Sequence, residues 1–282
     1  MLDLRAMVQD KAFLETIMDS EFAFPYEGIN APQLALSLMP NLKSTDPVLR
    51  DDLSYSILAR ILIEGLLSSA EVEELLNIAM SDDYLFSGIG EEENDTVFSR
   101  TFSILVIGAA LDSDAETRIL APERIHHIVS VVLEYAKRKK DHRGYVDGKG
   151  WAHAVAHTAD ALDSCAHHPV CTVEERTAIL HTIAELVVCS DSFTHNEDDR
   201  LAFPVYRIIR AQQITYDYLR DWILDFEPQE STVRSDNVQH FLQSLYFLVF
   251  WEDVNHPILQ DISVQLKKLN TFYRHGILPM NT

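Results

Sequence analysis

Histidines and cysteines gather in one part of this chain. Seven of its twelve histidines and all three of its cysteines lie between His142 and His195. Imidazole titrates near neutral pH and binds transition metals, and a deprotonated thiol is a nucleophile and a metal ligand. Three glycines between positions 144 and 150 predict a shaped loop, and a helix is expected from Gly150 to Ala166. This stretch is where chemistry is most expected.

Two imidazoles and a carboxylate share one face of that expected helix. His153, His157 and Asp160 stand at positions i, i+4 and i+7, which places them within roughly 60° of one another. Lys149 projects to the same side if the helix reaches back that far, whereas the opposite side carries Trp151, Val155, Ala159 and Leu162. The three groups could bind a divalent metal, with Asp160 as ligand or orienting group, or the histidines could transfer protons.

A structural role explains the same spacing. His153 and His157 would then bridge to acids or carbonyls of a neighbouring helix pair and fix its register. The zinc-protease pattern His-Glu-x-x-His is absent, because Ala154 stands where that pattern has glutamate. A metal site, an acid–base site and a structural network all remain open at this point.

A second polar feature is the acidic segment 196–200, Asn-Glu-Asp-Asp-Arg, at the start of another expected helix. Acids complement the positive end of a helix, and Asn196 could cap it, so the composition has a structural explanation. In the functional alternative, Glu197 or Asp198 faces the two histidines across a groove and completes a ligand set.

Charge and composition limit the partners. The chain of 282 residues has 44 acidic and 23 basic residues, a formal net charge of −21, which repels phosphate backbones and argues against nucleic acid. An odd, low cysteine count fits a reducing compartment. The N-terminus lacks an apolar signal-peptide core, and no apolar run reaches the ~20 residues of a membrane span. We therefore expect a cytoplasmic protein with neither nucleic acid nor membrane as partner.

Apolar residues recur at helical spacing nearly everywhere, which predicts an all-α protein. Besides the helix already mentioned, expected helices cover 47–67, 68–80, 95–111, 122–139, 172–188, 198–212, 215–224, 233–250 and 257–274. Ser68 with Glu71 and Thr172 with Glu175 resemble capping boxes. Short connections predict antiparallel helix pairs in a single domain, 1–282, stacked as an irregular HEAT-like curved array. A compact α/α bundle or toroid is the alternative.

Three sequence blocks resemble a known family. The first is Gly88-Ile-Gly-Glu followed by Asp95-Thr-Val-Phe-Ser-Arg100-Thr-Phe-Ser103. The second runs from Arg143-Gly-Tyr-Val through Lys149-Gly-Trp-Ala-His153-Ala-Val-Ala-His157-Thr-Ala-Asp160, and the third is Glu197-Asp-Asp-Arg-Leu201. They resemble the bacterial domain-of-unknown-function family DUF2785, with Thr101 and Thr158 as mild departures from its pattern.

The resemblance implies a cytosolic bacterial protein with a helical fold and supplies no reaction. It also implies that seven polar residues form one recurring constellation: Arg100, His153, His157, Asp160, Glu197, Asp198 and Arg200.

The leading functional hypothesis is a non-enzymatic helical-repeat protein that binds a protein or peptide. Stacked helix pairs create an extended concave face, and the acidic charge favours a basic partner. A homodimer through the aromatic C-terminal helices is a further interpretation, compatible with this hypothesis and with the enzyme hypothesis given next. The aromatics there, Tyr246, Phe247, Phe250 and Trp251, are expected to pack in the core or at a helix–helix seam.

The alternative hypothesis is an enzyme or small-molecule binder that uses the groove between Arg143 and Arg200. His153, His157 and Asp160, with Glu197 or Asp198, would bind a divalent metal or transfer protons. Three cations would hold a small anionic ligand, namely Arg100, Arg143 and Lys149, and Tyr145 or Trp151 would form the pocket wall.

Overall fold

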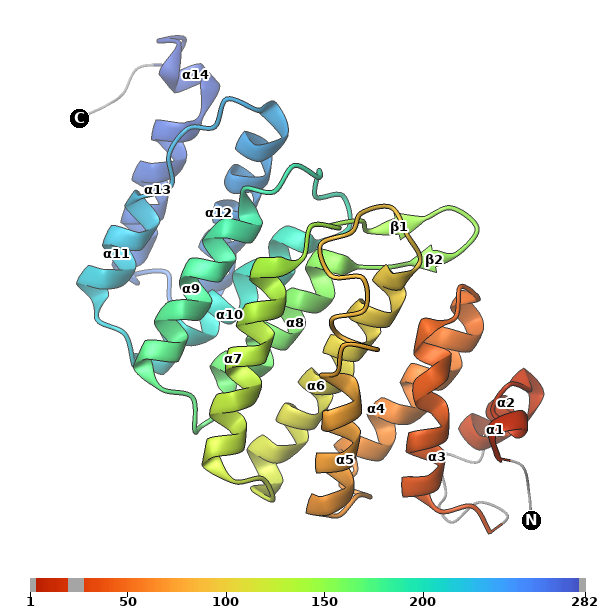
Figure 1. The fold of residues 1–282 in the computed structure, drawn as a ribbon. Coiled ribbons are helices and arrows are strands. Elements are labelled where there is room, and N and C mark those ends of the chain that lie inside the picture. The colour runs from red at the N-terminus through yellow and green to blue at the C-terminus, as the bar shows by residue number, and fades with distance from the viewer. Residues whose placement is uncertain (1–3, 20–27, 279–282) are drawn as a thin grey trace. The chain divides into compact units, whose positions relative to one another are not determined.

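The computed structural model describes residues 4–19 and 28–278. It confirms the all-α prediction, because the part it describes holds helices and one two-stranded hairpin (Figure 1). The chain divides into two compact units, Met1–Val170 and Cys171–Thr282, and each is described by itself. The single domain over 1–282 and the HEAT-like curved array stay predictions.

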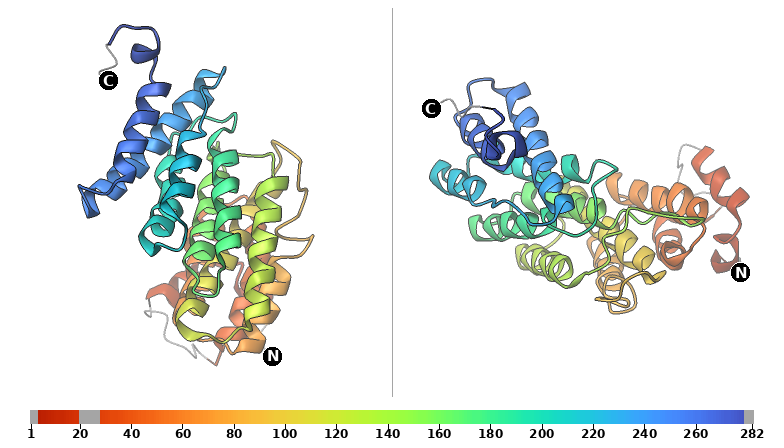
Figure 2. Two further views of the ribbon diagram at one scale, coloured as in Figure 1. Left: turned by 90° about the vertical axis from the view of Figure 1, so that its left-hand side faces the viewer. Right: turned by 90° about the horizontal axis from the view of Figure 1, so that it is seen from above.

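The first unit is built around a long buried helix. Its elements are α1 (Leu4–Met7), α2 (Lys11–Asp19), α3 (Ala31–Leu38), a 3-10 helix (Met39–Lys43), a π-helical segment (Val48–Tyr55), α4 (Ser56–Ile63), α5 (Ser69–Ala79), α6 (Thr96–Thr117), α7 (Pro122–Arg138), β1 (Tyr145–Val146), β2 (Gly150–Trp151) and α8 (Ala154–His167). Helix α6 packs against α4, α5 and α8 (Figure 1, Figure 2). The backbones of α6 and α8 approach closely at Gly108, where a Cβ would lie 3.6 Å from Cα of Ala161.

Among the described residues, α6 is the helix with the length and mean hydropathy of a membrane span. Within its most apolar window, 83% of the residues are buried inside the protein. Its face-to-face contacts with α4 and α8 explain this composition, because a helix that is apolar all round suits the centre of a core.

The second unit consists of α9 (Val173–Val187), α10 (Glu197–Ala211), α11 (Tyr216–Leu224), α12 (Thr232–Glu252), α13 (Ile258–Leu269) and α14 (Thr271–Arg274). Helix α10 packs along α12, and α11 along α13. The capping box predicted at Thr172 is confirmed: the Glu175 backbone N–H donates to Thr172 Oγ1 at 3.2 Å, and the Thr172 N–H to Glu175 Oε2 at 2.7 Å. The capping box at Ser68 is confirmed too.

Several expected boundaries were wrong for local reasons. The helix expected from Gly150 begins at Ala154, because Gly150 and His153 adopt left-handed backbone with φ of 79° and 47°. The helix expected over 257–274 is interrupted at Asn270, whose side chain accepts from the Phe272 N–H and caps α14. Of the two roles predicted for the C-terminal aromatics, packing in the core was wrong for Phe247, Phe250 and Trp251, because these are exposed, and a helix–helix seam stays a prediction.

Candidate functional site

The glycine-rich loop is a short hairpin held against the start of the π-helical segment. Tyr145 pairs with Trp151 and Val146 with Gly150, and the Ala152 N–H donates to the Gly144 carbonyl at 2.8 Å. A Cβ at position 150 would lie 2.6 Å from Cβ of Pro47. Only glycine therefore allows both the positive φ and the close approach at this position.

Arg50, for which no role was predicted from the sequence, holds the hairpin in place. Its Nη2 donates to the carbonyls of Lys149 at 2.9 Å and Trp151 at 3.1 Å, and its Nη1 to that of Ser44 at 2.7 Å. The guanidinium lies over the rings of two phenylalanines of α6, Phe98 at 4.0 Å and Phe102 at 4.9 Å. Burial lowers the pKa of Arg50 to about 10, so the side chain stays charged at neutral pH.

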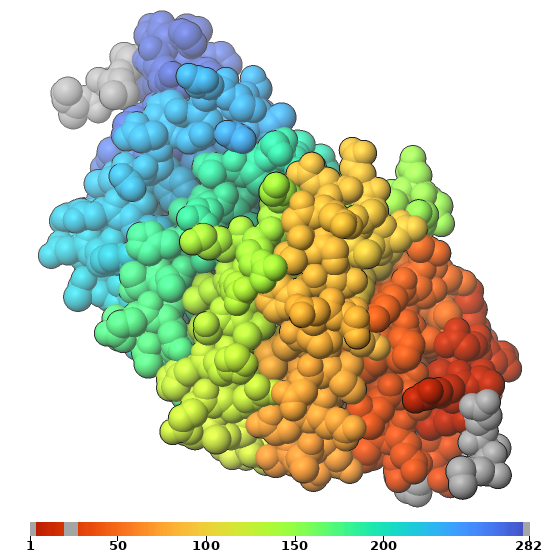
Figure 3. Space-filling view, in the orientation of Figure 1, coloured from red at the N-terminus to blue at the C-terminus, as the bar shows by residue number. Residues whose placement is uncertain are grey.

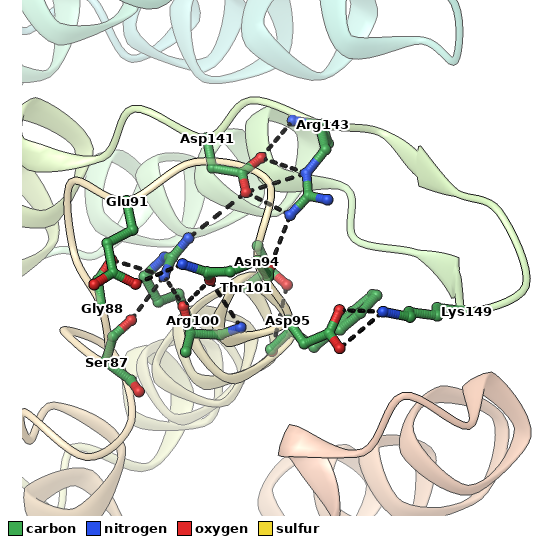
Figure 4. A network of polar contacts seen from close by, with 12 residues as sticks. Ser87, Gly88, Glu91, Asn94, Asp95, Arg100, Thr101, Asp141, Arg143 and Lys149 are labelled. Atoms are coloured by element: carbon green, nitrogen blue, oxygen red, sulfur yellow. Dashed lines mark hydrogen bonds and ion pairs between the residues drawn. The ribbon is translucent and has the colours of Figure 1, made fainter.

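A second buried arginine, Arg100 on α6, anchors the loop before that helix (Figure 4). Only 1% of Arg100 is exposed. Its Nη1 donates to the carbonyls of Ser87 at 2.7 Å and Gly88 at 3.1 Å, and to Thr96 Oγ1 at 2.6 Å. Its Nη2 forms an ion pair with Asp141 Oδ2 at 3.8 Å. Arg100 thus joins the 87–96 loop to the segment that leads into the hairpin.

Asp141 connects Arg100 to Arg143. The buried Asp141 carboxylate accepts from Arg143 Nη2 at 2.6 Å and Nε at 2.9 Å, and these hydrogen bonds raise the pKa of Arg143. Arg143 Nη2 also donates to the Asn94 carbonyl at 2.7 Å. No sequence pattern singles out Asp141, since its role depends on two arginines, one of them 41 positions earlier in the chain.

Lys149 pairs with Asp95 at the edge of this network. Its Nζ lies 2.6 and 2.8 Å from the two carboxylate oxygens of Asp95, and both side chains are exposed. Arg100, Arg143 and Lys149, the cations predicted to hold an anion, thus each have a carboxylate partner within the protein. The role of these cations in binding an anionic ligand stays a prediction.

The predicted histidine face is part of a ladder of rings, in which successive contacts join Tyr145, Trp151, His153 and His157. The ring of His153 stacks on that of Trp151, with centroids 4.4 Å apart and planes 3° apart, and lies 5.1 Å from the ring of His157. The edge of Tyr145 contacts Trp151 at 4.9 Å. The prediction that Trp151 points away from His153 was wrong, because both residues precede the first turn of α8.

His157 itself is inside the fold. It is 5% exposed, its Nδ1 lies 3.2 Å from the Thr101 carbonyl, and its ring meets Phe102 at 5.2 Å in an edge-on contact. Asp160 is half-buried on α8. Within residues 4–19 and 28–278, no group of three or more His, Cys, Asp or Glu side chains is arranged to hold a metal ion. The catalytic and metal-binding roles of His153, His157 and Asp160 stay predictions.

The acidic segment 196–200 belongs to the second unit. Glu197 is 5% exposed, and its Oε2 accepts from the backbone N–H groups of Thr194 at 3.0 Å and His195 at 2.8 Å. It therefore stabilises the turn in which Asn196, with φ of 63°, starts α10. Asp198 accepts a long hydrogen bond from Ser244 Oγ at 3.4 Å, and Arg200 is half-buried. The predicted ligand set that combines these residues with the histidines stays a prediction.

Comparison with known proteins gives one result. Residues 85–247, more than half of the chain, match the family model described as a protein of unknown function (DUF2785). No curated protein and no solved structure matches. The matched range includes the 87–96 loop, the arginine network, the hairpin, the ladder of rings and the acidic segment. The chain therefore belongs to the DUF2785 family.

Proposed function

We propose that this protein is a non-enzymatic binding module whose partner is a basic polypeptide. The observation that carries the proposal is an aromatic stripe on the last turns of α12. The exposed fractions are 48% for Phe247, 37% for Phe250 and 74% for Trp251, and Val254, just beyond the helix, is 60% exposed. Large aromatic side chains left in contact with water on one face are typical of protein-binding surfaces.

The charge of the chain supports a basic partner over a second copy. With 44 acidic against 23 basic residues, two copies repel each other, whereas a cationic polypeptide is attracted over several ångströms of solvent. The ion pairs of the first unit favour a binding module over an enzyme that acts on an anionic substrate. There, Arg100, Arg143 and Lys149 each pair with a carboxylate, and His157 bonds a backbone carbonyl.

Fluorescence anisotropy with labelled amphipathic peptides of about 15 residues tests this proposal. One peptide carries arginines on its polar face, and its matched control carries citrulline, which has the same shape without the charge. We expect the cationic peptide alone to bind, and more weakly as salt is added. A Phe247→Ser, Trp251→Ser variant should lose at least about tenfold in affinity, since buried aromatic anchors contribute about 2 kcal/mol or more each.

Ile63→Ser is the matched control variant, because Ile63 is also exposed, at 63%, but lies at the end of α4 in the first unit. It should bind as the parent does. Equal binding of the citrulline peptide, or undiminished binding by the α12 variant, contradicts the proposal. Light scattering identifies the competing occupant: a dimer that dissociates on Trp251→Ser would assign the stripe to a second copy of the chain.

A further inference from the structure

A separate pocket lies between α9 and α11 in the second unit. Its volume is about 580 Å³, and His181 of α9 and Val188, just beyond α9, line it together with Tyr218 and Trp222 of α11. Figure 3 shows the face on which these two helices are visible. The lining continues into the segment after α11, with Phe226 and Glu227. The volume suits a small organic group or a long side chain.

The charge around this pocket is negative. None of the ten lining residues is Lys or Arg, and three are acids. Two of the acids are neutralised from outside the lining, Asp221 by Arg220 at 2.8 Å and Glu227 by Lys268 at 2.9 Å. The exposed Asp225 carboxylate has no ion pair or hydrogen bond with any residue that the structure describes. One negative charge at this pocket is therefore available to a cation.

The walls of the pocket are aromatic, and Trp222 forms one of them. Trp222 is 7% exposed, and its Nε1–H has no hydrogen-bond partner in the described part of the chain. Edge-on contacts with Phe226 at 5.2 Å and Phe241 at 6.2 Å fix its ring. This nitrogen lies below the protein surface, so the indole ring, and not its N–H, is available to a ligand in the pocket.

Tyr218 completes the wall and stays neutral. Its hydroxyl lies 3.0 Å from His181 Nε2, and burial raises its pKa. The pocket thus combines flat π surfaces and one uncompensated carboxylate. A bare metal ion would leave the rings without a role, whereas a flat organic cation uses both features.

We propose that this pocket binds a guanidinium group on an alkyl chain. The guanidinium forms a charge-assisted pair with Asp225 and stacks on an aromatic wall of the pocket, while the alkyl chain extends toward its opening. Such a ligand is either a free metabolite that resembles arginine or an arginine side chain of a polypeptide. The site does not depend on the α12 stripe, so either proposal can fail while the other holds.

The test uses the full chain with isotope-labelled indole nitrogens, whose three tryptophans give separate N–H resonances in an NMR spectrum. Trp222→Phe identifies the Trp222 resonance. The probes are N-acetyl-arginine methylamide, free L-arginine and N-acetyl-citrulline methylamide. We expect an arginine probe to shift the Trp222 resonance, because the guanidinium binds beside this ring. The citrulline probe should bind at least about tenfold more weakly, because it lacks the charge.

The capped and free arginine probes distinguish the two sources. Tighter binding of the capped form indicates an arginyl side chain, and tighter binding of free arginine indicates a metabolite. Asp225→Asn should weaken the favoured probe at least about tenfold. Asp147→Asn removes the same charge from an exposed hairpin turn that does not line the pocket and should leave affinity unchanged. Dispersed indole resonances confirm that each variant is folded.

Three results overturn the proposal. The first is an unshifted Trp222 resonance with both arginine probes. The second is equal affinity for the citrulline and arginine probes, which would mean that the pocket recognises shape without charge. The third is an Asp225→Asn variant that binds as tightly as Asp147→Asn, which would remove the carboxylate from the site.

Discussion

Asp141→Asn tests whether the arginine network stabilises the first unit. The substitution keeps the size of the side chain and removes its charge, which leaves the guanidinium of Arg100 buried without a counter-ion. The side chains of Arg100 and Asp141 are 2% and 1% exposed, so water cannot replace the lost carboxylate. Removal of one member of a buried ion pair costs about 3–5 kcal/mol. The hydrogen bonds from Arg143 weaken as well.

Asp95→Asn is the matched control, because it removes the same charge from an ion pair at the surface. Asp95 and Lys149 are 48% and 39% exposed, and an exposed pair contributes about 0–1 kcal/mol. For a unit of this size, each kcal/mol lowers the melting temperature by about 2–4 °C. We therefore expect a fall of about 6–20 °C for Asp141→Asn and of less than about 4 °C for Asp95→Asn.

The assay must report on the first unit alone, since two units need not unfold together. Of the three tryptophans, Trp151 belongs to the first unit, and Trp222 and Trp251 belong to the second. Urea unfolding followed by the fluorescence of Trp151, in a background with the other two changed to phenylalanine, isolates the relevant transition. If Asp141→Asn and Asp95→Asn lose the same free energy of unfolding, burial of the network does not stabilise this unit.

Burial and capping give the remaining predictions. Burial lowers the pKa of His168 from its ordinary 6.5, so the unfolded chain takes up a proton at a higher pH than the folded protein does. The contribution of His168 to stability is therefore complete above pH 6.5 and falls as the pH drops below it. Melting temperatures across this range should show the fall, and His168→Gln should abolish it. All three cysteines are buried, and burial raises the pKa of Cys171 to about 12, so the folded protein should resist Ellman's reagent until urea is added; rapid labelling would contradict this. Thr172→Ala should cost about 1 kcal/mol in urea unfolding, and an unchanged midpoint would show that the Thr172–Glu175 box is dispensable.

Apolar periodicity and cap residues were sufficient to predict most helices. The start of α9 was read correctly because Thr172 and Glu175 satisfy each other's backbone N–H groups locally. The start of α8 was not, because the left-handed φ of His153 and the pairing of Val146 with Gly150 depend on the hairpin as a whole. Helical projection from Gly150 therefore placed Trp151 on the wrong side.

The candidate site was predicted in its residue types and not in its contacts. Arg100, Arg143 and Lys149 were predicted to bind a negatively charged partner, and a small anionic ligand was expected in that place. The structure supplies internal carboxylates, Asp141 and Asp95, from other segments of the chain. Arg50 had a weak signal, as an arginine within an otherwise apolar helical stripe, but its two acceptors in the hairpin lie about one hundred positions away.

Packing within the first unit explains why the two sequence blocks at 88–103 and 143–160 are rich in polar residues. The 87–96 loop lies against α6 and the hairpin against the start of the π-helical segment, and their backbone carbonyls have no partners within a helix. Arginine satisfies several acceptors at once because its donors point in fixed directions from one planar group. Arg100 serves the carbonyls of Ser87 and Gly88, while Arg50 serves those of the hairpin. A protein that holds two irregular loops against its helices therefore needs such residues whether or not it has a ligand. Evidence for binding has to come from groups that packing leaves unsatisfied, and at the pocket of the second unit the Asp225 carboxylate is such a group among the described residues.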